Sequence, residues 1–169
     1  SDIHDPQEVL TRALALSERS DKPVVIADTQ DNPGAGADSN TTGMLHALRA
    51  AGAGRRLPGQ VALGLLYDPA AARLAHEAGI GATLEMSVGK AVRCYDGCLS
   101  DPPVRGDFKG LSLSDGVVPM HGPMTAGGTA HLGLSAGVEI EGIRINLVSG
   151  QCQMLDLDLF RFLGVEPER

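Results

Sequence analysis

Three short apolar runs alternate with helix-like segments through the first half of the chain, and this order restricts the fold more than any other sequence feature. The runs are residues 23–28 (PVVIAD), 61–68 (VALGLLYD) and 82–89 (ATLEMSVG). Short, continuous apolar runs are typical of strands buried on both faces of a sheet. The α-β-α-β-α-β order therefore predicts a sheet, at least partly parallel, with helices packed on it.

The helix-like segments carry their own start and stop signals. An Asp-Pro pair precedes the first and the third, and Asn40 or Thr41 is placed to cap the second. Glycines follow the second and the third, where helices commonly end. The three predicted helices are residues 6–19, 41–54 and 69–79.

The second half has a different pattern. Residues 90–103 are loop-like, and residues 104–150 are short alternating stretches broken by glycine, which favours antiparallel strands with hairpin turns at 114–116 and 141–142. Residues 156–163 predict a last helix. The expected fold class is α/β with α+β character: a mixed sheet in which the alternating first half is followed by antiparallel strands and a C-terminal helix.

Length and charge limit the organisation and the partners. With 169 residues, 43% of them hydrophobic, the chain predicts a single domain over residues 1–169. The formal net charge is −7 with no basic stripe, so we expect no nucleic-acid partner. No apolar run reaches the roughly 20 residues of a membrane span, and the first residues lack signal-peptide features, so we expect no membrane partner.

The cysteines and histidines form no recognisable motif. Cys94-x-x-x-Cys98 lacks a second ligand pair, which favours two free thiols over a structural zinc site. Three cysteines are too few for a disulfide framework, and this favours a reducing, cytoplasmic location. His121 and His131 fall in the turn-rich second half, where either could line a site.

The best candidate site is the glycine-containing loop in ADTQDNPGAGADSNTTGML, residues 27–45. It lies between a predicted strand and a predicted helix, where α/β sheets commonly bind ligands. No phosphate-binding glycine motif matches, and its three aspartates favour a metal, cation or amide over a phosphate. Aspartate, asparagine, proline and glycine are also common turn formers, so the residues leave a purely structural interpretation open.

This loop resembles the D-N-P-G-G-G signature of the C-terminal domain of the MlrC (microcystinase C) family of metallopeptidase-like hydrolases. YDPAAARLAHEAGIGATLEMSVGK is similar to the next segment of that family, and LFRFLGVEPER to its closing segment. Ala35 stands where the family usually has the middle glycine. Asn40 stands where an aspartate commonly precedes the threonine pair.

The resemblance implies that the chain is a fragment of a longer hydrolase that cleaves amide or peptide bonds with zinc-bound water. An N-terminal domain of the same chain would hold most of the zinc ligands, so no metal ligand is assigned here. The resemblance implies that the glycine loop faces an inter-domain active site for a small peptide or amide substrate. The implied catalytic residues are Asp28, Asp31 and Asn32, and the implied substrate-binding residues are Gly34, Gly36, Asn40 and Thr41.

Two alternatives belong to other functional classes. A non-catalytic module could bind a small ligand in the glycine loop, and the lack of a complete ligand set favours it for an isolated domain. The domain could instead supply an interface to the N-terminal domain or to a second copy, which would make a homo-oligomer.

Overall fold

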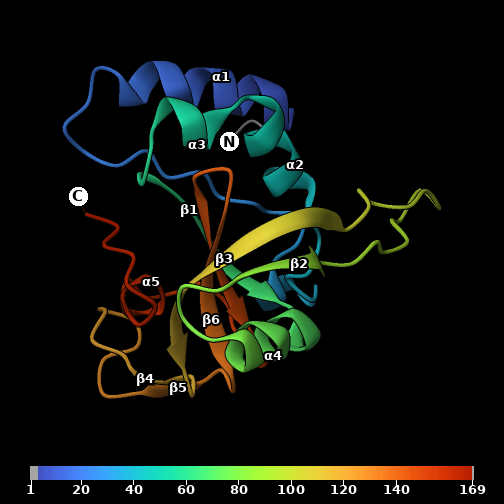
Figure 1. Cartoon of the computed structure of the whole chain (residues 1–169). Helices are drawn as coiled ribbons and strands as arrows, with labels where there is room; N and C mark the ends of the chain where they lie inside the picture. Colours follow the sequence, from blue (N-terminus) through green and yellow to red (C-terminus); the bar gives the residue numbers. More distant parts are fainter. Residues whose placement is uncertain (1–3, 169) are drawn as a thin grey trace.

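The computed structural model describes residues 4–168 and shows a curled sheet with helices on it (Figure 1). Ser1–Ile3 and Arg169, at the ends of the predicted domain, lie outside the described residues. No helix within residues 4–168 has the length and apolar character needed to cross a bilayer. The elements in chain order are α1 (Pro6–Ser17), η1 (Pro33–Ala35), α2 (Gly43–Ala50), α3 (Ala53–Arg56), β1 (Val61–Tyr67), α4 (Pro69–Ala78), β2 (Thr83–Val88), β3 (Val104–Ser114), β4 (Val117–Pro119), β5 (Thr129–His131), β6 (Ser135–Ile140), β7 (Ile143–Val148) and α5 (Asp158–Arg161).

The main sheet has five strands in the order β1-β7-β6-β3-β2. β1 pairs with β7 in parallel, and the other neighbours are antiparallel. β6 and β7 form a hairpin whose turn residues Glu141 and Gly142 have φ angles of 51° and 81°, as expected of the two-residue turns that suit twisted strands. The predicted mixed sheet and the predicted turn at 141–142 are confirmed.

The predicted strand at residues 23–28 is wrong. This segment has no regular secondary structure and pairs with no described strand, and Val25 is 85% exposed. Ile26 packs against the main core as a partly buried residue. A short apolar run can also be a loop that packs on the core through a single side chain. The apolar pattern alone cannot distinguish such a loop from a buried strand. The alternating first half therefore lacks its first strand.

Three smaller predictions also need correction. The helix predicted over residues 41–54 is interrupted because Gly52 adopts a left-handed φ of 63°, and α2 and α3 replace it. The turn at 114–116 makes no hairpin between β3 and β4, because β3 pairs with β6 and β4 with β5. The C-terminal helix is only α5, and Gly164, with φ of 84°, follows it.

Two hydrophobic cores lie on different sides of β1. In the main core, the small residues Ala71, Ala72 and Ala75 bring α4 close to the sheet, and all three are buried. The smaller core lies under α5, where Leu65 and Leu159 pack beside the β4-β5 pair. Figure 1 shows α1, α2 and α3 together at one end of the molecule and β4-β5 at the other.

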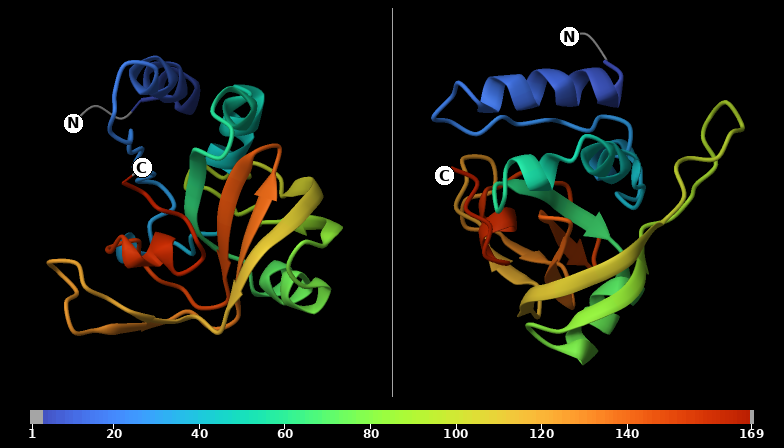
Figure 2. Two further views of the ribbon diagram at one scale, coloured as in Figure 1. Left: turned by 60° about the vertical axis from the view of Figure 1, so that its left-hand side comes forward. Right: turned by 45° about the horizontal axis from the view of Figure 1, so that its top comes forward.

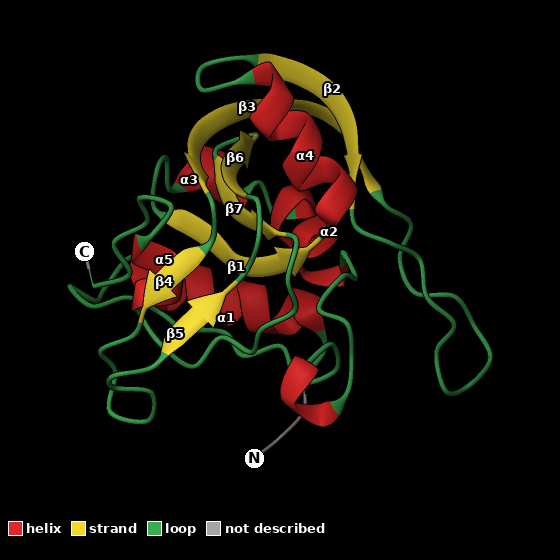
Figure 3. Cartoon of the chain, turned by 90° about the horizontal axis from the view of Figure 1, so that it is seen from below, coloured by secondary structure: helices red, strands yellow, loops and turns green. Residues whose placement is uncertain are grey.

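The two outer strands of the main sheet approach each other at their carboxyl ends because the sheet curls (Figure 3). The Gly89 backbone N–H, just after β2, donates to Asp68 Oδ2, just after β1, over 2.9 Å. Asp68 Oδ1 accepts from the Ala71 N–H at the start of α4. The predicted Asp68-Pro69 helix start is therefore confirmed, and the same carboxylate joins the two strand ends.

Residues 89–103 form a projecting arm between β2 and β3 (Figures 1 and 2). The predicted loop character is confirmed, since no strand or helix falls within residues 90–103. An isolated antiparallel bridge joins Arg93 and Leu99 near its tip.

Candidate functional site

The glycine loop, residues 28–42, lies against the outer edge of β1. The Ser39 hydroxyl donates to the Leu65 carbonyl over 2.9 Å, and the Tyr67 N–H donates to the Ser39 carbonyl over 2.8 Å. Ser39 adopts a left-handed φ of 57°, which is uncommon for a residue with a side chain. These contacts place the loop at the carboxyl end of β1, the position expected of a ligand site in an α/β sheet.

Asp31 holds the loop in shape. Its Oδ1 accepts from the Ser39 N–H over 2.8 Å. Its Oδ2 accepts from the Thr41 N–H over 2.7 Å and from the Thr41 hydroxyl over 2.8 Å. Each carboxylate oxygen therefore bonds to the loop itself, and Asp31 with Thr41 fixes the backbone that the other candidates occupy.

Asn32, Gly34 and Gly36 build the short helix η1 at the tip of the loop. Asn32 Oδ1 caps η1 by accepting from the Gly34 N–H over 2.9 Å. The Gly36 N–H donates to the Pro33 carbonyl, and Gly36 has a left-handed φ of 92° that favours glycine. Both glycine N–H groups thus donate within the loop.

Asp28 and Asn40 lie at opposite ends of the loop and differ in burial. Asp28 is exposed, and its Oδ1 accepts from the Gln30 N–H over 3.0 Å. Asn40 is only 5% exposed, and its Oδ1 has no donor within reach among the described residues. Neither Asn40 nor Thr41 caps α2; the N-cap residue is Thr42, whose hydroxyl donates to Pro102 instead.

A cavity of about 290 Å³ adjoins the loop where the ends of β1 and β2 meet. Its lining combines two carboxylates, one amide and one ammonium group on Asp38, Asn40, Asp68 and Lys90, together with Tyr67, Pro69 and Gly89. A cavity of about 380 Å³ lies between α1 and the α2-α3 segment, away from the glycine loop. The smaller cavity is the better candidate because polar groups from three separate segments converge on it.

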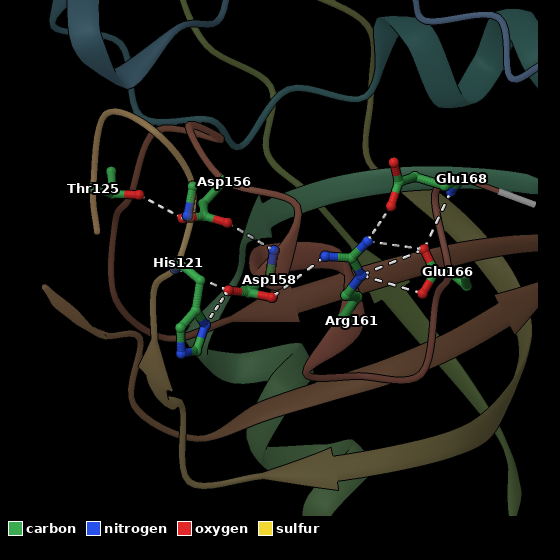
Figure 4. A network of polar contacts seen from close by, with 8 residues as sticks. His121, Thr125, Asp156, Asp158, Arg161, Glu166 and Glu168 are labelled. Carbon is green, nitrogen blue, oxygen red and sulfur yellow. Dashed lines mark hydrogen bonds and ion pairs between the residues drawn. The ribbon is translucent and has the colours of Figure 1, made fainter. Parts of the chain in front are cut away.

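A second polar cluster holds the loop after β4, and we call it the Asp156–Asp158 clamp (Figure 4). Asp156 Oδ2 accepts from the Gly122 N–H over 2.7 Å and also from the Thr125 hydroxyl. Asp158 Oδ2 accepts from the His121 N–H over 3.0 Å and bonds to His121 Nδ1 over 2.7 Å. Two aspartates two residues apart therefore fix both ends of residues 121–125.

The clamp lowers the pKa values of its two carboxylates and orients the His121 ring. The hydroxyl of Thr125 is the main group that lowers the pKa of Asp156, and the ring of His121 is the main group that lowers the pKa of Asp158. Because an ionised carboxylate can only accept, His121 Nδ1 donates to Asp158, and the ring is oriented with Nε2 on its other side. The His121 side chain is 79% exposed, so Nε2 faces outward.

One segment connects the clamp to the glycine loop. Gln151 Nε2 donates to Asp38 Oδ1 over 2.7 Å. A Cβ added to Gly34 would lie 2.3 Å from Oε1 of Gln153, so that side chain covers the loop backbone. Three residues later the same segment supplies Asp156. The two polar regions therefore share the chain that leaves β7.

Within residues 4–168, no three His, Cys, Asp or Glu side chains come together as a set that could hold a metal ion. The Asp31 carboxylate is already bonded to backbone and hydroxyl donors. The described residues therefore do not fit a zinc centre of their own, which would need three or four protein ligands.

Comparison with known proteins decides the family. Residues 26–169 match the MlrC C-terminus family. The chain belongs to this family. The match covers the glycine loop, the cavity and the clamp, and it confirms the resemblance predicted from the D-N-P segment.

Relatives of this MlrC C-terminus domain are much longer than the chain. Microcystinase C of Sphingomonas sp. is 32% identical over 148 residues, which cover 86% of this chain and 26% of that protein. A solved structure from Mesorhizobium sp. BNC1, named "Putative metallopeptidase", has a TM-score of 0.76 at 22% identity, over 94% of this chain and 30% of that one. The second likeness establishes a shared fold, and the chain spans only about a quarter of the length of microcystinase C.

Sequence reasoning missed the clamp. His121 was only one of two secondary candidates, and the other, His131, lies on β5 outside both polar regions. Asp158, the partner of His121, lies 37 residues further along the chain, in an Asp-x-Asp segment that no motif marks as a site. The available signal was the pair Asp156 and Asp158, spaced two residues apart at the start of a short helix.

Proposed function

We propose that this MlrC C-terminus domain is part of a metal-dependent hydrolase that cleaves amide or peptide bonds. The domain would contribute its D-x-x-D-N-P-G loop to an active site shared with an N-terminal metal-binding domain of the same chain. One observation carries the proposal: the glycine loop is held by its own acids at the carboxyl end of β1, beside a polar cavity. A loop whose shape is fixed in this way is better suited to position groups in an active site than to act as a flexible linker.

The seven candidate residues divide by what they contact. Asp31, Asn32 and Thr41 position the loop through bonds within it. Gly34 and Gly36 keep its tip compact through their bonds within the loop. Gln153 covers Gly34, and a Cβ added to Gly36 would meet no atom within 4 Å, so Gly36 is the glycine that leaves the backbone open to a substrate. Asp28 is the exposed carboxylate, and Asn40 lines the cavity, so these two are the groups we assign closest to substrate.

Zinc in such a protein would be held mainly by the N-terminal domain, because the described residues do not form a zinc centre. When bound, zinc would polarise an amide carbonyl and activate water. The residues of this domain would shape and orient a small peptide or amide substrate beside it. A cytoplasmic location remains our expectation from the low cysteine content.

A second function is favoured by the same cavity. Its mixture of carboxylate, amide and ammonium groups is suited to a small polar ligand, so a non-catalytic binding module is the alternative. Saturable binding of a dipeptide by the isolated domain, together with unchanged turnover of all loop variants in the longer protein, would favour this alternative.

The test compares the Asp28→Asn and Asp31→Asn variants of the full-length protein that contains this domain. Hydrolysis of a peptide-amide substrate is measured in the presence of zinc. We expect Asp28→Asn to lower kcat/KM at least about tenfold, as loss of a positioned polar group does, while the unfolding midpoint stays unchanged. Asp31→Asn should lower both activity and stability.

The matched control is Asp96→Asn, an exposed acid on the arm. It should leave activity and stability unchanged. Full turnover in Asp28→Asn would remove Asp28 from the site, and full turnover in both loop variants would refute the proposed role of the loop.

A further inference from the structure

The tip of the arm is a tight hairpin with a cysteine on each side. The Cys94 N–H donates to the Cys98 carbonyl over 2.8 Å, and the Gly97 N–H donates to the Cys94 carbonyl over 3.0 Å. Gly97 has a left-handed φ of 85°. This is the three-residue hairpin in which a turn ends in a left-handed glycine.

The bridge between Arg93 and Leu99 fixes the register. In antiparallel pairing one step nearer the tip, Cys94 lies directly opposite Cys98. Directly opposed residues project on the same face of a ladder. In a hydrogen-bonded pair their Cα atoms are about 5.5 Å apart, within the range of roughly 4.4–6.8 Å that disulfides span.

We propose that Cys94 and Cys98 form a thiol–disulfide modification site at the tip of the arm. Both residues are exposed free thiols. The site is independent of the hydrolase assignment, because it requires only the hairpin and a small-molecule disulfide as oxidant.

The chemistry is a two-step exchange with a disulfide of the glutathione type. The thiolate of one cysteine attacks the oxidant, forms a mixed disulfide and releases one small thiol. The second thiolate then attacks the protein sulfur, closes the Cys94–Cys98 bond and releases the other small thiol. The protein loses two hydrogen atoms and two electrons, and one oxidant molecule becomes two thiols.

The bond should be reversible. Opposed Cβ atoms in a ladder are about 4.5–5.5 Å apart and are closer in pairs without hydrogen bonds, whereas a relaxed disulfide needs about 3.5–4.5 Å. Closing the bond must therefore draw the two sides of the tip together. Strained or exposed disulfides are easily reduced, which is a property of regulatory rather than structural bonds.

Cys152 provides an internal contrast. It is half-buried beside the smaller core, and burial raises the pKa of its thiol. A raised pKa lowers the thiolate fraction and slows exchange. Its neighbour Gln151 bonds to Asp38 of the glycine loop.

The experiment incubates the folded chain with oxidised glutathione at pH 7.5 and follows intact mass and peptide maps. We expect loss of two hydrogen atoms with a Cys94–Cys98 cross-link, and reversal by a small thiol. Cys152→Ser should behave as the unchanged chain. Cys94→Ser and Cys98→Ser should each stop at a single glutathione adduct.

The same reaction in urea shows whether the hairpin matters. The cross-link should form at least about tenfold faster in the folded chain, because the hairpin fixes a pair that a flexible segment brings together only transiently. Adducts without a cross-link, a cross-link to Cys152, or equal rates in urea would each overturn the proposal.

Discussion

The glycine loop and the Asp156–Asp158 clamp use aspartate for the same purpose at different chain separations. In the loop, Asp31 accepts from Ser39 and Thr41, eight and ten residues away. In the clamp, Asp156 and Asp158 accept from residues more than 30 positions away. One region is shaped by a local carboxylate, and the other joins two distant segments.

The two regions also differ in the side chain that each leaves exposed to solvent. The loop turns the Asp31 carboxylate inward and leaves Asp28 exposed. The clamp turns two carboxylates inward and leaves the Nε2 of His121 exposed. An aspartate that looks reactive in the sequence can therefore be a positioning group, and the exposed partner nearby is then the better candidate for contact with a ligand.

The largest effect is expected from Asp31→Ala. The change leaves the N–H groups of Ser39 and Thr41 and one hydroxyl without their acceptor, and it should lower the free energy of unfolding by roughly 2 to 4 kcal/mol. Urea denaturation measures it. Asp28→Ala should change stability by no more than about 0.5 kcal/mol, as at most exposed positions. Equal effects of the two changes would contradict the assigned division of roles.

Acid should weaken the clamp. The pKa values of Asp156 and Asp158 in the folded chain lie below their ordinary value of 3.8. Their stabilising contribution is therefore complete above about pH 4, near the pKa of an unfolded aspartate, and is lost as the pH falls through the folded pKa. Asp156→Asn should lower the urea midpoint at pH 6, and its difference from the unchanged chain should shrink towards pH 3. A difference that is constant with pH would show that the carboxylate charge is unimportant.

The smallest effect on stability is expected at His121. His121→Ala should leave the urea midpoint nearly unchanged, because the ring is mostly exposed and the backbone N–H bond to Asp158 remains. Nitrogen NMR of the unchanged chain should show the ring protonated at Nδ1 in its neutral form. Asp158→Ala should abolish that preference, and a neutral ring protonated at Nε2 in the unchanged chain would refute the geometry of the clamp.

The fold was predictable where local pattern and tertiary environment agree. Residues 61–68 and 69–79 carry both an apolar pattern and an Asp-Pro boundary, and they are β1 and α4 in the structure. Residues 23–28 carry only the apolar pattern. Their strand prediction failed because the Ser39 segment bonds to the edge of β1, and no described strand pairs with residues 23–28.

The distinction between local and distant contacts also explains which parts of the candidate site could be predicted from the sequence. The glycine loop could be found because its shape depends on residues within one short segment. The cavity could not, because it needs the ends of β1 and β2 and the loop to meet, and that meeting depends on the curl of the sheet. The clamp needs a partner 37 residues away, and no local pattern specifies such a pairing.

The bonds of Ser39 to Leu65 and Tyr67 have a further consequence for the outermost strand. β1 pairs with β7 on one side, and Ser39 bonds to backbone groups of β1 on the other. Unpaired backbone groups at the edge of a sheet are templates for pairing with another chain. The glycine loop thus also protects an edge strand against aggregation, and loss of the Asp31 bonds should make the protein self-associate through β1.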